Sequence, residues 1–138
     1  MNIMEVKFSA KSENESLARV IVASFAAKLD PTIDELSDIK TAVSEAVTNA
    51  IIHGYEEDET KFVHMRCELI ENTIKIVIED YGKGIADIEE ARQPMFTSKP
   101  ELERSGMGFS FMESFMDDMQ VASIVGEGTK VIMTKTIE

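Results

Sequence analysis

Apolar residues recur with the period of an α-helix over residues 38–54, the strongest pattern in the chain. At about 100° per residue, one side of this helix collects Ile39, Ala42, Val43, Ala46 and Ala50. Glu45 and Asn49 lie one turn apart on the border of that side. His53 continues their row, and Gly54 supplies a C-terminal stop. A carboxylate and an amide oxygen in one row can order a water and a divalent cation. The alternative is an ordinary half-buried helix whose polar residues flank the core.

The segment before this helix predicts a strand and another helix. Residues 4–8 alternate as a short strand, and Ser12 with Glu15 is typical of a capping box. The helix that begins there is expected to point Leu17, Val20, Ile21 and Leu29 inward. Arg19 projects from the opposite side. We therefore expect this helix to pack on the sheet side through large aliphatic residues.

The rest of the pattern is mainly that of strands. Thr32 and Glu35 form a second capping box, which starts the helix of residues 38–54. Period-two alternation predicts strands at about 62–70, 73–80, 121–125 and 129–136. A Glu71-Asn72 turn joins the first pair, and Gly126-Glu127-Gly128 joins the second. Together these elements predict an α+β fold, a single-domain α/β sandwich over residues 1–138. Its helices cover one face of a mixed, mainly antiparallel sheet.

Asp80 is the most unusual polar residue of the strand pattern. It follows Ile74, Ile76 and Ile78 at a spacing of two, so it shares their inward face. A buried carboxylate costs several kcal/mol unless something donates a hydrogen bond to it, and a ligand with an exocyclic amine, such as adenine, could do so. Gly82 and Gly84 would let the backbone turn and approach that ligand closely. The alternative is a β-turn with a capping Asp, which the inward register disfavours.

A second glycine motif, Ser105-Gly106-Met107-Gly108-Phe109, opens a helical pattern with apolar Phe109, Met112, Phe115 and Met116. Glycines at a helix start leave backbone N–H groups free to hold phosphate oxygens. The alternative is a flexible linker that enters a core helix. The motif is neither the dinucleotide fingerprint GxGxxG nor a Walker A loop.

The segment of residues 93–104 has no helical or strand period and contains Pro94 and Pro100. Loops of this length in small domains are usually functional or disordered. Because a glycine motif lies on each side, we interpret it as a functional lid. Its phosphate donors would be Thr97, Ser98, Lys99 and Arg104. For the last two, the alternative is a simple solvated charge.

Composition narrows the possible partners. The net charge of −12, from 14 basic and 26 acidic residues, argues against direct nucleic-acid binding and suits a basic protein partner. No apolar run approaches the roughly 20 residues of a membrane span. Cys67 is the only cysteine, which excludes an internal disulfide and agrees with a cytoplasmic protein. His53 and His64 are too few for a zinc site.

The three motifs in this order resemble the ATP-binding domain, or Bergerat fold, of gyrase, heat-shock chaperones, histidine kinases and mismatch-repair ATPases. The segments 44–55 and 89–108 resemble most closely the small anti-sigma factors that are also serine-protein kinases. That resemblance covers nearly the whole chain. It implies transfer of the γ-phosphate of ATP to a protein serine, with Mg²⁺.

The same resemblance implies a role for each site residue. Glu45 would act as general base, Asn49 would ligate the metal and Asp80 would accept from the adenine amine. Thr129 would support Asp80. The other nucleotide-binding residues would be His53, Gly82, Gly84, Thr97, Ser98, Lys99, Arg104, Gly106, Met107 and Gly108.

The resemblance also implies partners. One is a sigma factor held inactive, with a sporulation sigma factor expected, and the other is an anti-anti-sigma factor that supplies the acceptor serine. The chain would form a homodimer, and Arg19 would contact the partner proteins.

Three alternatives share these motifs. A stress-response anti-sigma kinase would have the same chemistry and another sigma factor. A stand-alone ATPase or a histidine-kinase catalytic module would share the three motifs. A histidine kinase would also need a phosphoacceptor helix pair, for which the 138 residues leave no room. Replacement of Glu45 or Asn49 by another residue type would favour a pure binding module without catalysis, but both residues are present.

Overall fold

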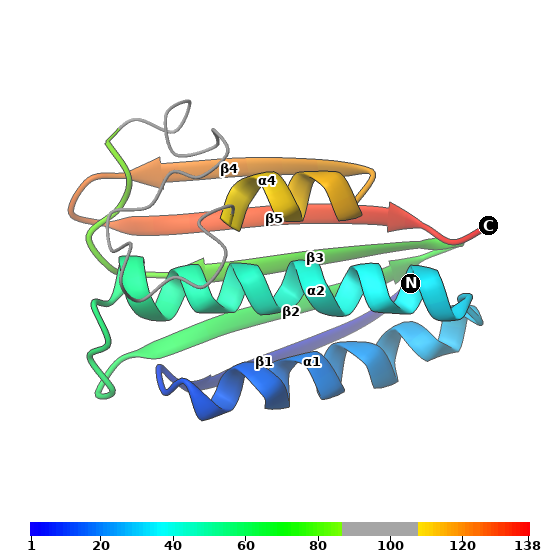
Figure 1. Cartoon of the computed structure of the whole chain (residues 1–138), viewed down its shortest axis with the longest axis horizontal. Helices are drawn as coiled ribbons and strands as arrows, with labels where there is room; N and C mark the ends of the chain where they lie inside the picture. Colours follow the sequence, from blue (N-terminus) through cyan, green and yellow to red (C-terminus); the bar gives the residue numbers. More distant parts are fainter. Residues whose placement is uncertain (87–107) are drawn as a thin grey trace.

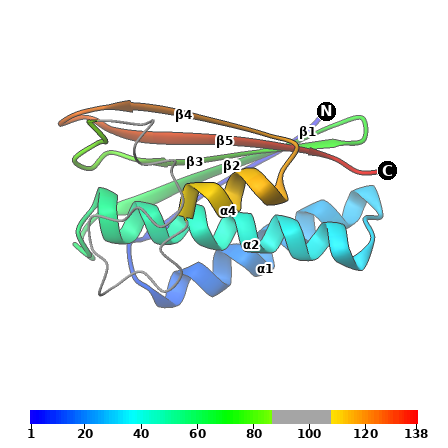
Figure 2. The ribbon, with the colours of Figure 1, turned by 45° about the horizontal axis from the view of Figure 1, so that its top comes forward.

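The computed structural model describes residues 1–86 and 108–138 and forms two layers, with the helices on one face of a sheet (Figures 1 and 2). The elements are β1 (Asn2–Ser9), α1 (Glu13–Ala26), α2 (Ile33–Asn49), β2 (Phe62–Ile70), β3 (Thr73–Asp80), α4 (Gly108–Phe115), β4 (Asp118–Ile124) and β5 (Gly128–Thr136). A 3₁₀ turn, η1 (Ala27–Leu29), extends α1, and a π turn, η2 (Ala50–Gly54), extends α2. The α+β prediction is confirmed.

The sheet has the order β1-β2-β3-β5-β4. Every pairing among the described strands is antiparallel, so the sheet is more regular than the mixed one expected. The hairpin at Glu71-Asn72 and the bounds of β2 and β3 are as predicted. β4 begins earlier than predicted, at Asp118. The inner face of the sheet and the helices enclose one apolar core, which includes Cys67, and burial raises the pKa of that thiol to about 12.

Helix α2 lies at the centre of the helical layer and follows the predicted pattern. Its capping box is present: the Thr32 hydroxyl accepts from the Glu35 N–H at 3.0 Å, and the Glu35 carboxylate accepts from the Thr32 N–H at 2.9 Å. The predicted apolar side is buried along its whole length, from Ile39 to Ala50. Residues 44–49, which carry the polar row, are therefore held rigidly against the core.

Helix α1 differs from the prediction in two ways. Ser12 has helical φ/ψ and makes no side-chain cap, so the first capping box is wrong; the Glu15 N–H bonds the Ser12 carbonyl instead, at 3.2 Å. Leu17 and Val20 are exposed rather than inward. The buried side is Ala18, Val22, Phe25 and Ala26. Two of these are alanines, because α1 packs directly on α2 and small residues permit a close approach.

Arg19 lies beside this buried side and is partly exposed. Its Nε is 3.7 Å from the Glu15 carboxylate, one turn earlier on the same helix. Among the described residues, no helix is long and apolar enough to span a membrane.

Candidate functional site

Asp80 ends β3 on the inner face of the sheet, as its register predicted. It is 5% exposed, in line with the buried Ile74, Ile76 and Ile78. The Gly82 N–H donates to its Oδ1 at 2.9 Å. Burial raises the pKa of Asp80 from its ordinary 3.8 to about 6. The backbone N–H groups of Gly82 and Thr129 lower this pKa, but burial outweighs both, so a further donor would stabilise the carboxylate.

Glycine backbone packs around this carboxylate from two sides. A Cβ on Gly54 would lie 2.6 Å from the Asp80 carboxylate, and a Cβ on Gly82 would lie 1.9 Å from the Gly54 carbonyl oxygen. The Lys83 N–H donates to that same carbonyl at 3.0 Å. Any side chain at Gly54 or Gly82 would thus fill the space beside Asp80. The sequence pattern indicated a close approach of the backbone to a ligand at Gly82. For Gly54 it indicated only the end of a helix.

The turn after Gly82 is fixed to the β4–β5 hairpin. Gly84 has a φ of +78°, and a Cβ there would lie 2.4 Å from the Ile124 carbonyl oxygen. The Gly126 N–H donates to the Lys83 carbonyl at 2.7 Å. Thr129, the partner of Asp80 across the β3–β5 ladder, is 8% exposed. Thus the structure brings together the predicted residues Asp80, Gly82, Gly84 and Thr129.

Two hydroxyl residues that the sequence pattern did not single out support this arrangement. The Tyr55 hydroxyl accepts from the Tyr81 N–H at 2.8 Å and donates to the Phe62 carbonyl at 2.7 Å. Burial raises the pKa of Tyr55 above its ordinary value. Ser123 accepts from the Ile85 N–H at 2.7 Å and lies 2.8 Å from the Thr129 hydroxyl. No sequence signal marked either residue, because each acts through tertiary contacts.

The polar row of α2 leads directly to this carboxylate. Glu45 and Asn49 are half-buried, and the α-helix gives way to the π turn immediately after Asn49. π turns are rare and often occur at functional sites. The turn carries half-buried His53 and ends at Gly54, which packs on Asp80. The row and the carboxylate therefore belong to one continuous site.

Asn49 carries an unusual feature for a half-buried side chain. Its Nδ2 is buried, and no hydrogen-bond partner for it occurs among the described residues. Buried polar atoms are nearly always paired in native proteins. No group of three or more His, Cys, Asp or Glu in the described part of the chain could hold a metal by itself.

Several predicted residues lie outside the described part of the chain: Thr97, Ser98, Lys99, Arg104, Gly106 and Met107. Gly108 is the first residue of α4, and the buried Phe109 and Met112 within it, with buried Met116 just after it, agree with the predicted helical pattern. Among the described residues, the site thus has a carboxylate end at Asp80 and a polar row at Glu45 and Asn49.

Comparison with known proteins assigns the class. The model of the histidine kinase-like ATPase domain matches residues 8–135, and the chain therefore belongs to that family. Within the family, it is 63% identical over 134 residues to the anti-sigma F factor of Clostridium perfringens (strain SM101 / Type A), covering 97% of this chain and 96% of that one. It is 60% identical to the anti-sigma F factor of Anoxybacillus flavithermus (strain DSM 21510 / WK1), covering 97% and 92%.

A solved structure supports the same fold. The RsbU and RsbW domains of Rv1364c from Mycobacterium tuberculosis match with a TM-score of 0.71 at 16% identity, covering 99% of this chain and 32% of that one. At this identity the match shows the fold alone. The resemblance to the small anti-sigma factors is confirmed by the sequence relatives.

Proposed function

We propose that the chain is an anti-sigma factor that is also an ATP-dependent protein serine kinase. It would bind and inhibit a sporulation sigma factor, sigma F by the names of its relatives, and phosphorylate a serine of its anti-anti-sigma antagonist. One observation carries the proposal: Asp80 is a buried carboxylate with a raised pKa, enclosed by Gly54 and Gly82, in a histidine kinase-like ATPase domain. Such a group matches the amine of adenine.

The adenine end would work by donor and acceptor matching. Asp80 would accept from the exocyclic amine, Thr129 would support it, and Gly54 and Gly82 would leave the ring room. GTP has a carbonyl where ATP has that amine, so it would place an acceptor against an acceptor. We expect wild type to prefer ATP and Asp80→Asn to weaken ATP binding. Equal affinities for ATP and GTP in calorimetry would contradict the adenine contact.

The phosphate end would lie along the polar row of α2. Asn49 would offer its amide oxygen as one metal ligand and its buried Nδ2 to a bound phosphate. Mg²⁺ prefers oxygen ligands and would neutralise the phosphate charge. Glu45 would take the proton of the attacking serine hydroxyl. Because phosphoryl transfer demands little covalent chemistry, positioning by this rigid helix would supply much of the catalysis.

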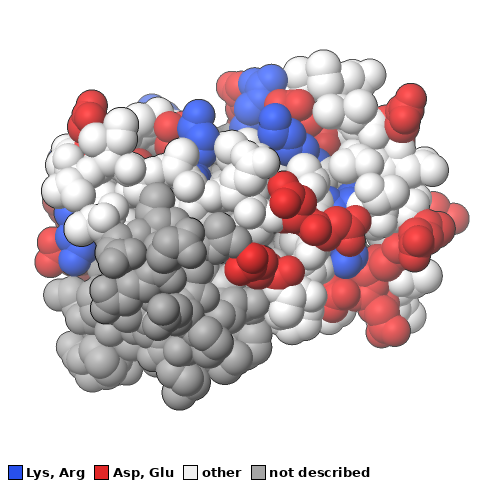
Figure 3. Space-filling model, turned by 90° about the horizontal axis from the view of Figure 1, so that it is seen from above, with Lys and Arg blue, Asp and Glu red and all other residues white. Residues whose placement is uncertain are grey.

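The partner surface is expected to include Arg19. The chain carries a net charge of −12, and on the side away from α1, seen in Figure 3, acidic side chains gather at the right, at the end away from the grey segment. A basic partner would be attracted to such a surface. Arg19 is 43% exposed, so it can exchange its contact with Glu15 for one with a partner. We further propose that the chain is a cytoplasmic homodimer.

The kinase proposal is tested by incubating the chain with Mg-ATP and a purified anti-anti-sigma factor. We expect one phosphoserine on that protein by mass spectrometry, and none when its acceptor serine is alanine. ATP hydrolysis without any phosphoserine would support a stand-alone ATPase instead. Co-purification with the chain would identify the sigma factor, and a sigma factor other than sigma F would indicate the stress-response type.

The partner surface is tested with Arg19→Glu. Interface arginines are often hot spots, worth about 2 kcal/mol or more, so sigma-factor affinity should fall at least tenfold while ATP affinity and melting temperature stay unchanged. Lys28→Glu on η1, which changes the charge equally, is the control. Unchanged sigma-factor affinity would place the partner surface elsewhere.

A further inference from the structure

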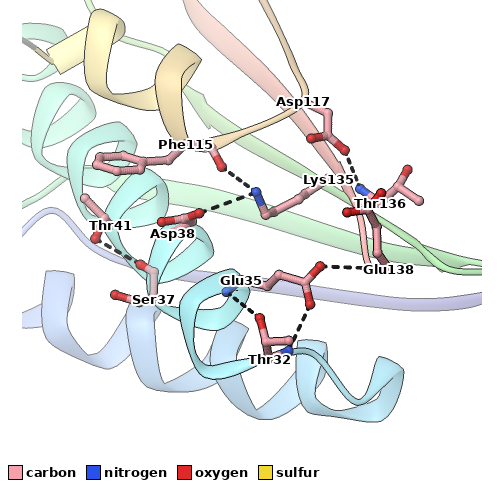
Figure 4. A network of polar contacts seen from close by, with 10 residues as sticks. All are labelled: Thr32, Glu35, Ser37, Asp38, Thr41, Phe115, Asp117, Lys135, Thr136 and Glu138. Carbon is pink, nitrogen blue, oxygen red and sulfur yellow. Dashed lines mark hydrogen bonds and ion pairs between the residues drawn. The ribbon is translucent and has the colours of Figure 1, made fainter.

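Lys135 makes an unusual set of contacts at the end of the sheet far from Asp80 (Figure 4). It lies on β5, and its side chain is only 12% exposed. Its Nζ donates to the Phe115 carbonyl at 2.8 Å and lies 3.6 Å from the Asp38 carboxylate. Thus one partly exposed ammonium joins β5, the last residue of α4 and helix α2.

The carbonyl that Lys135 binds is one of those that a helix leaves unpaired at its C-terminus. A cation there also interacts favourably with the helix dipole. The residue Asp117, just after α4, is fixed to the same strand: its N–H donates to the Thr134 carbonyl at 2.9 Å, and its carboxylate accepts from the Thr136 N–H at 2.7 Å. The C-terminal end of α4 is therefore anchored to β5.

The opposite end of α4 begins at Gly108, in the glycine motif predicted to hold phosphate. A helix of this length spans about 12 Å, so a shift or tilt at its anchored end moves its start. Buried Met112 holds the middle of α4 in the core, next to α2. The contacts of Lys135 and Asp117 at the C-terminal end of α4 therefore help to set the position of its N-terminal residue, Gly108.

Asp38 connects this anchor to the polar row of the site. Glu45 and Asn49 follow Asp38 at spacings of seven and eleven residues. At about 100° per residue, these spacings bring all three to within about 20° of one direction on α2. Lys135 therefore contacts the row that carries the proposed base and metal ligand, about two turns before Glu45 and about three turns before Asn49.

We propose that Lys135 is a positioning residue for phosphate binding: it fixes the end of α4 to the Asp38 end of the polar row, and so sets where the start of α4, at Gly108, lies relative to Glu45 and Asn49. The inference rests on the proposed function. Lys135 acts from a distance, because an extended strand separates it from Thr129 by about 20 Å. It would therefore affect the phosphates of a nucleotide and not the adenine end.

This selectivity can be measured with ATP and adenosine as probes, each with Mg²⁺, by calorimetry or competition. In Lys135→Met, which keeps the length and the apolar stem, ATP should bind about tenfold more weakly, as for loss of one charge-assisted bond. Adenosine affinity should stay within about twofold. Lys135→Arg should restore most of the ATP affinity. Lys130→Met, on an exposed position of the same strand, should change neither.

Unchanged ATP affinity in Lys135→Met, or a parallel loss for ATP and adenosine, would overturn the proposal. If wild type binds no ATP, the proposed function itself fails, which is a different result. If Lys135→Met does not fold, Asp38→Asn provides the test, because it keeps the hydrogen bond to Phe115 and weakens only the link to α2. A selective loss of about threefold for ATP is then expected, and no loss would overturn the proposal.

Discussion

Two carboxylates, one near each end of the sheet, have pKa values that are shifted in opposite directions. Burial raises the pKa of Asp80 to about 6, although the backbone N–H groups of Gly82 and Thr129 lower it. At the other end, the backbone N–H of Thr32 and then that of Glu138 lower the pKa of Glu35 (Figure 4). Both carboxylates interact with two backbone N–H groups, so burial makes the difference. Glu35 is partly exposed, whereas Asp80 is buried and would be stabilised by a further donor from a ligand.

The ends also differ in how they pack. Around Asp80, backbone meets backbone, and a Cβ at Gly82 or Gly128 would lie 1.9 Å or 2.1 Å from a carbonyl oxygen. Around Lys135, side chains bond to backbone: the Lys135 Nζ donates to the Phe115 carbonyl, and the Asp117 carboxylate accepts from the Thr136 N–H. Side-chain networks tolerate small changes by shifting rotamers, whereas backbone contacts do not. Substitutions at the Asp80 end should therefore impair binding directly, whereas those at the Lys135 end should affect ATP binding only through the position of α4.

The largest expected effect is on the chemical step. Glu45→Gln keeps the shape of the side chain but removes its ability to accept a proton. General-base loss typically costs about 10²–10⁴ in rate, so serine phosphorylation should fall by that factor while ATP affinity stays close to wild type. A phosphorylation time course checks the rate and calorimetry checks the affinity. Near-normal turnover would show that Glu45 is not the general base, and the polar row of α2 would then serve only in binding.

The next effect concerns Asp80 and pH. Its folded-state pKa of about 6 exceeds its ordinary 3.8, so the folded state holds this proton more tightly than the unfolded state. Its contribution to stability is therefore present below about pH 4 and is lost as the pH rises to about 6, by on the order of 3 kcal/mol. Asp80→Asn lacks this titration. The variant should be more stable than wild type at pH 8 and comparable at pH 4.

Melting temperatures of both proteins across this pH range test the idea, since the other carboxylates contribute equally to each. A constant difference between the two proteins would show that Asp80 does not titrate abnormally. The same variant should bind ATP more weakly, because a neutral amide is the poorer acceptor. Higher stability with weaker binding would mark Asp80 as a residue kept for function.

Much of the fold could be predicted because local pattern and tertiary packing agree. The period of α2, the Thr32 capping box and the alternation that turns Asp80 inward each follow from neighbouring residues. The buried side of helix α1 was predicted wrongly, because α1 packs on α2 through the small Ala18 and leaves the larger Leu17 exposed. Amphipathicity weighs large apolar residues most, whereas a close helix pair requires small ones.

The candidate site was less predictable than the fold. Asp80 could be found from the sequence because the strand alternation places this charged residue on the apolar, inward face. Gly54, Tyr55 and Ser123 gave no such signal, since their role is to touch segments that are distant in sequence. An α-helical pattern also could not show that α2 changes to a π turn after Asn49.

A smaller effect separates steric cost from backbone strain. In Gly82→Ala the new Cβ would lie 1.9 Å from the Gly54 carbonyl oxygen, so the backbone beside Asp80 must move. Overpacking of this kind costs about 1–3 kcal/mol, and ATP affinity should fall with it. Gly126→Ala meets no atom within 4 Å, but has a φ of +85°, so it should cost about 1 kcal/mol without loss of ATP affinity. Equal ATP affinities in Gly82→Ala and wild type would show that this backbone lies outside the pocket.

The smallest effect compares the two predicted capping boxes, which had different outcomes and lie at opposite ends: Thr32 at the Lys135 end and Ser12 at the Asp80 end. Thr32→Ala removes a hydroxyl that accepts from the Glu35 N–H at 3.0 Å, and should cost about 1 kcal/mol of stability. Ser12→Ala should be nearly neutral, because the Ser12 side chain makes no cap. Urea denaturation distinguishes the two, and neither variant should change ATP affinity. If Ser12→Ala cost as much as Thr32→Ala, the start of α1 would be capped in solution after all; if Thr32→Ala weakened ATP binding, the two ends of the sheet would be coupled through α2.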